Sequence, residues 1–442
     1  MQRIILIIFL FVKIFSYDKA NLDIFKSLTS ICNNCFPYRL KLSSDGEIII
    51  SIPSLYNSKN SRIGNNKNFS FVIFDEDNDK FQPFLESYEI NSVMGYYIDK
   101  NNKYYILDQG KISNNDYIVE KNTAKLIVYD SNSEKSKEYN FGRFDLSNSI
   151  LTDVVVDHEG KYAYITDSGN LLKNESNPGI IVLDLESEKV YKILINDTSF
   201  KPDKNYEKIS TNNPIYNFFN NAVGVNSIQI SCNDETIYYS SLKSNKIYSV
   251  STKDISNAIK KFGDSKKIGD LKNIKVNSAD RNFKSESFIL SSKHNLFMTN
   301  SELKNIDVSF YINRDLSSYN YNSNSKIKSK DNNIDMPFSL DIYDGNLYLL
   351  SNKFDGKFNL SNSVIYTAKL KKDELNSNIG CSVFTFKIYS EVIFVFGWFF
   401  IILCVIILLI IVKSGKKLEK SNLMKEIEKE EEINELNREL NE

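Results

Sequence analysis

Residues 151–169 read LTDVVVDHEGKYAYITDSG, two strand-like runs that flank a tight acidic turn. Aliphatic and β-branched residues lead into the DHEG turn, and the chain resumes as an aromatic-rich run that ends in Asp and Ser. The stretch therefore predicts a β-hairpin. Variants of it recur, and the copies begin at Tyr38, Ser92, Leu151, Gly224, Glu286 and Met336.

The spacing of these copies predicts the architecture. Successive copies begin about 50 to 75 residues apart, which suits one four-stranded propeller blade per copy, with outer strands and loops of variable length. Outer strands are expected at Thr123–Tyr129, Lys135–Phe141, Gly179–Asp184, Lys189–Ile195 and Lys246–Ser251. Two stacked β-sandwiches are the competing all-β arrangement, but repeated hairpins without a Cys…Trp…Cys spacing favour the propeller. We predict an all-β, six-bladed β-propeller.

Several of these stretches resemble the major royal jelly protein and yellow family. They are LTDVVVD, YAYITDSG and GIIVLD within 151–184, VMGYYID and YYILDQG within 93–110, GVNSIQIS, TIYYSSL and IYSVST within 224–252, and SLDIYDGNLYLLSN at 339–352. The resemblance covers roughly residues 84–370. It implies a secreted six-bladed propeller. Some members bind small ligands such as biogenic amines, and some are linked to dopachrome conversion.

The N-terminal stretch MQRIILIIFLFVKIFS has the features of a signal peptide. Arg3 precedes an apolar core at residues 4–12, and Ser16 is a small residue suited to cleavage. We therefore expect a signal peptide at residues 1–16 and the propeller ectodomain at 17–390. Because Lys13 interrupts the core, an uncleaved anchor is the alternative.

Near the other end, residues 392–412 read VIFVFGWFFIILCVIILLIIV and carry no charge. About 20 apolar residues span a bilayer as a helix, whereas a buried helix of a soluble protein usually has a polar face. Lys413, Lys416 and Lys417 follow the stretch and Glu391 precedes it. The positive-inside rule then places the C-terminus in the cytosol. We expect a single-pass protein of the plasma membrane or another secretory-pathway membrane, with the propeller outside or lumenal.

The tail, residues 413–442, is dense in Lys and Glu. Its apolar residues recur at spacings of three, four and six, at Leu423, Ile427, Ile433, Leu436 and Leu440. This pattern predicts an amphipathic helix that self-associates weakly as a coiled coil. A solvated charged helix is the alternative, since fewer than three clean heptads are present.

Cysteines and sequons fit a secretory route. Of five cysteines, Cys404 lies in the predicted span, and the other four form an even set suited to two disulfides: Cys32, Cys35, Cys232 and Cys381. A bond from the CxxC pair to Cys381 would help close the ring, and a local bond within that pair is equally open. Redox or zinc chemistry at the CxxC is the other interpretation. Predicted N-glycosylation sites are Asn68, Asn174, Asn196 and Asn359.

Composition and motifs narrow the function. The 55 basic residues balance 56 acidic ones, which gives no electrostatic case for nucleic acid binding. Both histidines, His158 and His294, fall in predicted hairpin turns. The sequence has no GxSxG elbow, no Gly-rich phosphate loop and no HExxH motif, so serine-hydrolase, nucleotide-binding and zincin mechanisms are not supported.

The predicted functional region is the axial channel, where the first residues of the inner strands converge. The residues predicted to bind a ligand there are Asp153, Asn226, Glu286, Phe338 and Ser339. Oxygen atoms of Asp153, Asn226 and Glu286 could hold Ca²⁺, which takes about six to eight oxygen ligands. Alternatively, Asp153 accepts backbone N–H bonds where its blade begins. For the amine ligands that the family resemblance implies, Asp153 and Phe338 supply a carboxylate and an aromatic wall.

Three functions follow. The first is a membrane-anchored propeller that binds a small ligand or a protein through channel-mouth residues and long loops such as 196–223. The second is a metal-dependent enzyme of the lactonase or tautomerase kind working in the channel. The third is a structural surface scaffold whose tail organises partners. The anchor, together with the lack of a recognisable catalytic set, favours the first.

Overall fold

The computed structural model describes residues 21–28, 36–53, 70–110, 121–141, 144–169, 177–201, 224–241, 244–262, 274–281, 283–291, 294–300, 304–309, 312, 315–317, 319, 326–329, 334–354 and 360–370, and in the tail 422–425, 427–431, 434 and 438. The chain divides into two compact units, Met1–Phe384 and Thr385–Glu442. The first unit is a six-bladed β-propeller, as predicted from the repeated hairpins.

The first three blades are four-stranded antiparallel sheets whose strands follow one another in chain order. Blade 1 contains β2 (Arg39–Leu42), β3 (Ile48–Ser51), β4 (Phe71–Asp75) and β5 (Lys80–Pro83). Blade 2 contains β6 (Val93–Ile98), β7 (Lys103–Asp108), β8 (Lys125–Asp130) and β9 (Lys135–Asn140). Blade 3 contains β10 (Leu151–Val156), β11 (Tyr162–Asp167), β12 (Gly179–Asp184) and β13 (Val190–Ile193), followed by the 3₁₀ turn η2 (Thr198–Phe200).

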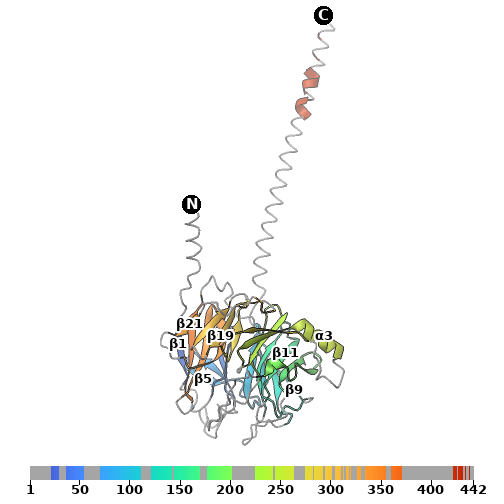
Figure 1. Cartoon of the computed structure of the whole chain (residues 1–442). Coiled ribbons are helices and arrows are strands. Elements are labelled where there is room, and N and C mark those ends of the chain that lie inside the picture. Colours follow the sequence, from blue (N-terminus) through green and yellow to red (C-terminus); the bar gives the residue numbers. More distant parts are fainter. Residues whose placement is uncertain are drawn as a thin grey trace, which may run out of the picture. The chain divides into compact units, whose positions relative to one another are not determined.

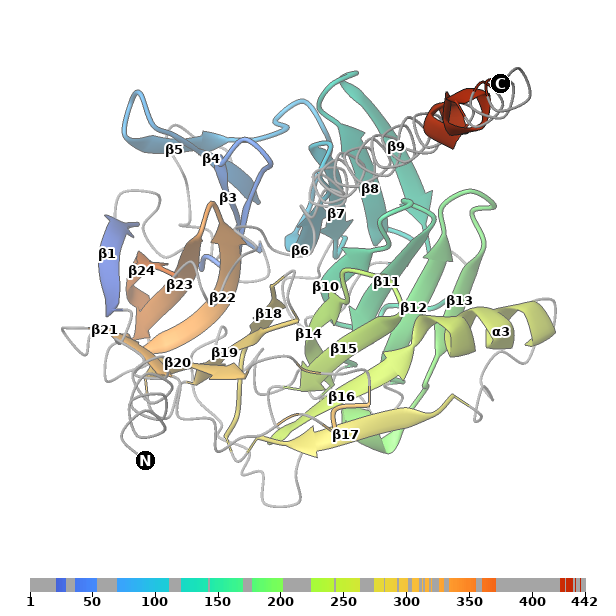
Figure 2. The same ribbon diagram turned by 90° about the horizontal axis from the view of Figure 1, so that it is seen from above.

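The remaining blades complete the ring. Blade 4 contains β14 (Val225–Ile230), β15 (Thr236–Ser241), β16 (Lys246–Ser251) and β17 (Val276–Asp280), with helix α3 (Thr252–Phe262) between its last two strands. Blade 5 contains β18 (Phe288–Leu290), β19 (Leu296–Asn300), β20 (Asn305–Ser309) and β21 (Lys326–Ser329). Blade 6 contains β22 (Met336–Tyr343), β23 (Asn346–Phe354) and β24 (Leu360–Lys369). Figure 2 shows the inner strands β6, β10, β14, β18 and β22 around the centre of the ring.

The N-terminal strand β1 (Asn21–Ser27) closes this ring. It pairs antiparallel with β24 and so becomes the fourth strand of blade 6. It also pairs parallel with β21 through Asn21 and Leu22, which joins blades 5 and 6 into one eight-stranded sheet (Figure 1). Lys26 forms an ion pair with Asp79 of blade 1. Sequence patterns did not predict this strand, because its partners lie more than 300 residues away and no hairpin turn adjoins it.

The repeated acidic and hydroxyl residues at the hairpin turns have a structural role. The backbone N–H of Lys161 donates to Asp157 Oδ1 at 2.6 Å, and that of Lys103 donates to Asp99 Oδ1 at 2.9 Å. In blade 4 the Thr236 N–H donates to Ser231 Oγ at 2.9 Å. Such side-chain acceptors stabilise tight turns locally. The DHEG motif and its variants therefore fix each inner hairpin.

A second set of acidic residues ends the second strand of blades 2 and 3. Asp108 Oδ1 accepts the N–H groups of Ser92 (2.8 Å) and Gly110 (2.9 Å). In blade 3, Asp167 accepts the Gly169 N–H at 2.8 Å and pairs with the buried Lys192 Nζ at 2.6 Å. These carboxylates hold the segments that enter and leave the hairpin. The LDQG and TDSG motifs are thus built into the blade itself.

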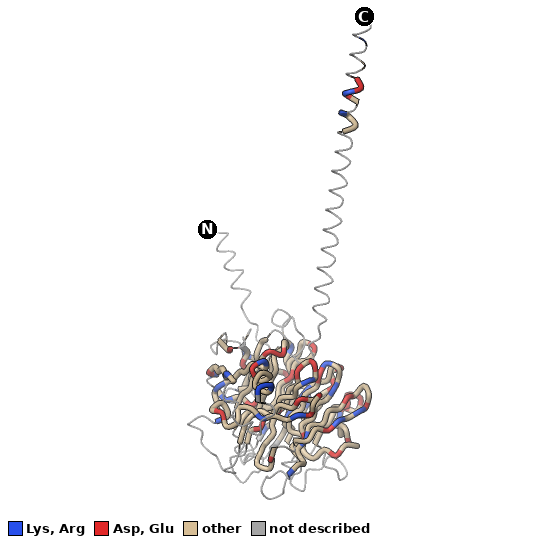
Figure 3. The backbone as a smooth tube through the Cα atoms, turned by 90° about the vertical axis from the view of Figure 1, so that its right-hand side faces the viewer, with Lys and Arg blue, Asp and Glu red and all other residues tan. Residues whose placement is uncertain are grey.

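Burial explains why the inner strands are so apolar. Every residue of β10 and of β15 is buried, since a neighbouring blade packs on each face. The largest apolar cluster runs through blades 2, 3 and 4 and includes Val155, Ile181 and Ile228. Helix α3 contributes Ile255 and Ile259 to it. Lys, Arg, Asp and Glu are interspersed along the described part of the propeller (Figure 3).

Several sequence predictions lie outside the described residues. These are the signal peptide at 1–16, the membrane span at 392–412, Cys32, Cys35, Cys381, Asn68, Asn174, Asn359 and most of the long loop 196–223. In the part of the chain that the structure describes, no helix is long and apolar enough to cross a membrane. Cys232 is disulfide-bonded, and Asn196 is exposed.

The second unit contains the tail. Residues 422–425 and 427–431 are helical, as predicted for this segment. Leu423, Met424 and Ile427 are 58%, 52% and 44% exposed. Self-association through this face stays a prediction.

Candidate functional site

Bulges mark the start of the inner strands and determine which atoms face the channel. The pairing register shifts between Leu151 and Asp153 in β10, and equivalent shifts occur in β6, β14 and β22. A bulge leaves one residue without a ladder partner and bends the strand. In β14 and β22 that residue is Asn226 and Phe338, whose carbonyl groups become available to other donors.

Arg39 of β2 fills the channel at this level. Its side chain donates to the carbonyl of Phe338 at 3.1 Å and to that of Asn226. A guanidinium nitrogen lies 3.4 Å from Asp153 Oδ2, and the group stacks over the Tyr38 ring at 4.6 Å. Arg39 is only 1% exposed. One cation therefore connects blades 1, 3, 4 and 6 and occupies the axis.

The predicted channel residues Asn226 and Glu286 contribute contacts between blades. Asn226 Oδ1 accepts the Tyr38 hydroxyl at 2.7 Å, and its Nδ2 donates to the Glu286 carbonyl at 2.6 Å. Burial raises the pKa of Tyr38 to about 12, so its hydroxyl stays protonated as the donor. Both Asn226 and Glu286 are buried. They surround the Arg39 level of the channel.

Phe338 and Ser339 lie at the same level. The Phe338 ring packs edge-on against Phe36 with centroids 5.0 Å apart. Ser339 Oγ accepts the Leu40 N–H at 3.0 Å and donates to the Leu40 carbonyl at 3.1 Å. The structure thus brings these two together with Asn226 and Glu286, but neither lines the pocket described next. Asp153 lines that pocket and Phe338 does not, so the predicted pairing of these two residues around one ligand stays a prediction.

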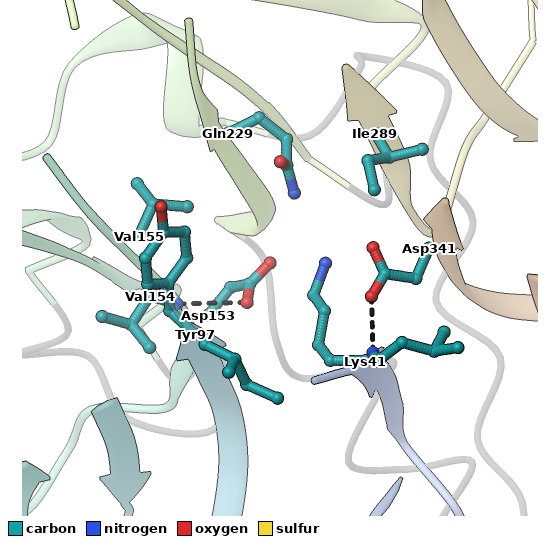
Figure 4. A pocket seen from close by; sticks show the side chains of 10 residues that line it. Lys41, Tyr97, Asp153, Val154, Val155, Gln229, Ile289 and Asp341 are labelled. Carbon is teal, nitrogen blue, oxygen red and sulfur yellow. Dashed lines mark hydrogen bonds between the residues drawn. The ribbon is translucent and has the colours of Figure 1, made fainter. Parts of the chain in front are cut away.

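The pocket lies one step further along the inner strands, and Asp153 is the predicted residue that lines it. The full lining consists of Lys41, Leu42, Tyr97, Ile98, Asp153, Val154, Val155, Gln229, Ile289 and Asp341 (Figure 4). The cavity is about 10 Å³, which is room for roughly one water molecule.

Gly95 allows the strands to approach one another beside Asp153. A Cβ atom at this position would lie 2.5 Å from the Asp153 Cα and 3.0 Å from its Oδ1. Any side chain would therefore separate β6 from β10. The glycine permits the close approach that places Asp153 at the edge of the cavity.

Two buried carboxylates dominate the electrostatics of this pocket. Asp153 and Asp341 are each 4% exposed. Asp153 accepts the N–H groups of Val154 (3.1 Å) and Ile228 (3.4 Å). Asp341 accepts those of Leu42 (2.7 Å) and Ile342 (3.0 Å). Backbone donors therefore fix both carboxyl groups in place.

Burial raises the pKa of both carboxyls. The positive charges of Arg39 and, to a smaller extent, Lys41 lower the pKa of Asp153 in opposition to burial. The charge of Lys41 does the same for the pKa of Asp341. The Lys41 ammonium points between the two carboxylates (Figure 4). The Tyr97 ring forms part of the wall. Burial raises the pKa of its hydroxyl, and the negative charges of Asp234 and Asp99 raise it further. The site is suited to holding a cation.

The calcium prediction stays a prediction. In the described ranges no group of three His, Cys, Asp or Glu side chains is placed to hold a metal ion. The cationic groups of Arg39 and Lys41 supply positive charge beside Asp153. The alternative role predicted for Asp153, accepting backbone N–H bonds near the start of its blade, is present in the structure.

Sequence reasoning did not identify Arg39, Lys41, Tyr97 or Asp341. A sequence signal was available only for Asp341, which follows the predicted Ser339 by two residues in the same strand. The guanidinium contacts of Arg39 could not be found in this way, since they depend on carbonyls exposed by bulges.

Both histidines lie in hairpin turns, as predicted, and both are partly buried. His158 Nδ1 lies 2.5 Å from Asp234 Oδ1, and the His158 N–H donates to Asp234 Oδ2 at 3.0 Å. This contact joins the turns of blades 3 and 4. His294 is partly buried, and that burial lowers its pKa.

The family model for major royal jelly protein matches residues 91–381. The chain belongs to the major royal jelly protein family. No curated protein matches the sequence.

Several solved structures are similar to this family member at low sequence identity. A luciferin-regenerating enzyme is 9% identical, with 79% of this chain and 95% of that chain covered and a TM-score of 0.45. Catalytically inactive virginiamycin B lyase from Staphylococcus aureus with quinupristin is 11% identical, with coverage of 80% and 100% and a TM-score of 0.42. Hydrazine synthase from Kuenenia stuttgartiensis is 11% identical, with coverage of 62% and 71% and a TM-score of 0.42.

Proposed function

We propose that this royal-jelly-family propeller is the binding head of a single-pass membrane protein and that it holds a small ammonium ligand in its axial pocket. The anchor is the uncharged stretch 392–412, and Lys413, Lys416 and Lys417 favour a cytosolic tail. The propeller would then face the cell exterior or a lumen. In that location Asn196 is available for glycosylation.

The pair of buried carboxylates is the observation that carries this proposal. A buried carboxylate is costly unless a cation or hydrogen bonds compensate it. Asp153 has Arg39 beside it, whereas Asp341 has Lys41 as its cationic neighbour. A ligand ammonium in the position of the Lys41 ammonium would compensate both groups. The ring of Tyr97 adds an aromatic wall, which also favours cations.

Access is expected from the end of the channel where the hairpin turns lie. Arg39 and the aromatic side chains of Tyr38 and Phe36 fill the opposite end, and all three are at most 1% exposed. The lining residues Ile98 and Val155 lie at or just before the ends of their strands. A ligand from the turn side therefore reaches the carboxylates without disturbing the Arg39 contacts.

Titration calorimetry on the full chain in detergent micelles tests the proposal. Phenethylamine is compared with 2-phenylethanol, its neutral analogue, and with phenylpropionate, an anion. We expect binding of the amine alone. Asp341→Asn removes one carboxylate charge and should weaken binding about tenfold or more, which corresponds to roughly 1.4 kcal/mol. Asp280→Asn, at an exposed carboxylate on β17, is the matched control.

Two outcomes would contradict the binding site. Equal affinity for the amine and the alcohol would mean that charge has no role. Unchanged affinity in Asp341→Asn would place the ligand elsewhere. The anchor is tested separately, by protease treatment of sealed vesicles that carry the full chain. The tail should be cleaved only from the cytosolic side, and cleavage from the opposite side would reverse the proposed orientation.

A further inference from the structure

Lys41 places a primary ammonium on a four-carbon chain inside the axial pocket (Figure 4). Its backbone is fixed in the β2–β3 ladder opposite Ile49. The side chain is only partly buried. Within the described part of the chain, no hydrogen bond involves the Lys41 ammonium. Its interaction with the two carboxylates is therefore one of charge, without a hydrogen bond.

The two carboxylates are held much more firmly than the ammonium. Each accepts two backbone N–H groups, at 2.7 to 3.4 Å. Those donors belong to the inner strands or to residues beside them, and they do not depend on Lys41. A lysine side chain has several rotatable bonds and can move without a change in the backbone. The backbone thus fixes the two carboxylates, whereas the Lys41 side chain can change its rotamer.

We propose that Lys41 is a resident competitor, whose side chain occupies the place of the ligand's ammonium and must leave before the ligand enters. This inference rests on the proposed function and specifies it further. The cavity beside Lys41 has a volume of about 10 Å³, so little more than one water molecule fits while the side chain is present. The space that Lys41 vacates is narrow and linear. The site therefore selects unbranched primary alkylammonium groups.

Competition of this kind has a predictable size. The apparent affinity of a ligand falls in proportion to the fraction of protein whose site is open. If Lys41 occupies the pocket for about nine-tenths of the time, it weakens ligand binding roughly tenfold. Removal of the Lys41 side chain should therefore strengthen ligand binding by the same factor.

Lys41→Ala provides the direct test, because the atoms it removes correspond to n-propylamine. We would titrate n-propylamine into the full chain in detergent micelles by calorimetry, for the wild type and for Lys41→Ala. The expected result is a Kd at least about tenfold lower in the variant. Circular dichroism melts should show a larger rise in Tm with n-propylamine in Lys41→Ala than in the wild type. Neither n-propanol nor propionate should reproduce these effects.

A matched control comes from the surface of the propeller. Lys137 lies 2.7 Å from Glu188, and both side chains are at least half exposed. Lys137→Ala removes the same atoms from a carboxylate partner in solvent, so n-propylamine should stabilise this variant no more than it stabilises the wild type. Lys41→Gln removes the charge, keeps most of the bulk and provides a second variant should Lys41→Ala fail to fold. Its affinity for n-propylamine should exceed that of the wild type.

The outcomes separate this inference from the proposed function. Tight binding to Lys41→Ala with no amine binding to the wild type would support the resident competitor and refute the proposed function. Equal amine affinity in the wild type and Lys41→Ala would overturn the competitor role and leave the ammonium site standing. Equal responses to n-propylamine and n-propanol would overturn the inference, because filling a hole would then suffice. For Lys41→Gln, affinity at or below that of the wild type would also overturn it.

Discussion

Replacement of Arg39 by Met tests whether the axis of the propeller depends on one buried cation. Met keeps an unbranched side chain of similar length but removes the donors to the carbonyls of Phe338 and Asn226 and the charge beside Asp153. Removal of one partner from a buried ion pair typically costs about 3–5 kcal/mol. For a domain of this size, we expect Tm to fall by roughly 5–10 °C.

The dependence on pH follows from Asp153. Burial raises the pKa of this carboxyl, and Arg39 is the first group that opposes the rise. Without Arg39 the folded-state pKa moves further above the unfolded value. The native state then binds the proton more tightly than the unfolded state, so stability falls as pH rises from the unfolded pKa through the folded pKa. Arg39→Met should therefore lose more stability between pH 5 and pH 8 than the wild type does.

Circular dichroism melts of the full chain in detergent at pH 5 and pH 8 measure both effects. Asp153→Asn in the Arg39→Met background removes the unpaired charge and should recover part of the loss, with a coupling of about 1–3 kcal/mol. Arg281→Met is the control, because Arg281 is also fully buried and donates to the carbonyl of Ser244. Asp153→Asn should not restore stability to Arg281→Met. Additive effects of Arg39→Met and Asp153→Asn would refute the reasoning.

Two further predictions concern the blades around the site. Gly95→Ala places a Cβ atom 2.5 Å from the Asp153 Cα and should cost about 1–3 kcal/mol through forced separation of the strands; an unchanged urea midpoint would contradict it. Deletion of residues 21–27 removes the fourth strand of blade 6. It should lower Tm and expose blade 6 to trypsin first, whereas a wild-type digestion pattern would show that β1 does not close the ring.

The repeated hairpins could be predicted because the signal is local. Each inner hairpin combines two short strands with a turn whose acidic or hydroxyl residue accepts backbone N–H groups nearby. The predicted outer strands Gly179–Asp184 and Lys246–Ser251 coincide with β12 and β16. The closing strand β1 carries no such local signal. Its seven residues acquire their role only through pairing with β24.

The site could be predicted only in part, because side-chain direction depends on register. A prediction that the first residues of each inner strand face the axis ignores the bulges in β10, β14 and β22. One extra residue changes which side chains point inward from there onward. Phe338 consequently packs against Phe36, while Asp341, three residues later, lines the pocket. Asp153 lines the pocket together with Lys41, Tyr97 and Asp341, which the sequence analysis did not name, and its role in ligand binding stays a prediction.

Carboxylates lie on the turn side as well as in the pocket, which bears on how a ligand would be selected. Asp99 and Asp234 belong to turns near Tyr97, whose pKa they raise, so the approach to the pocket attracts cations. Inside, Lys41 already balances part of the carboxylate charge. Entry of an ammonium ligand would then exchange one cation for another and leave the net charge of the pocket unchanged. Charge would therefore govern the approach, whereas the fit of the alkyl chain in the space that Lys41 leaves would govern affinity.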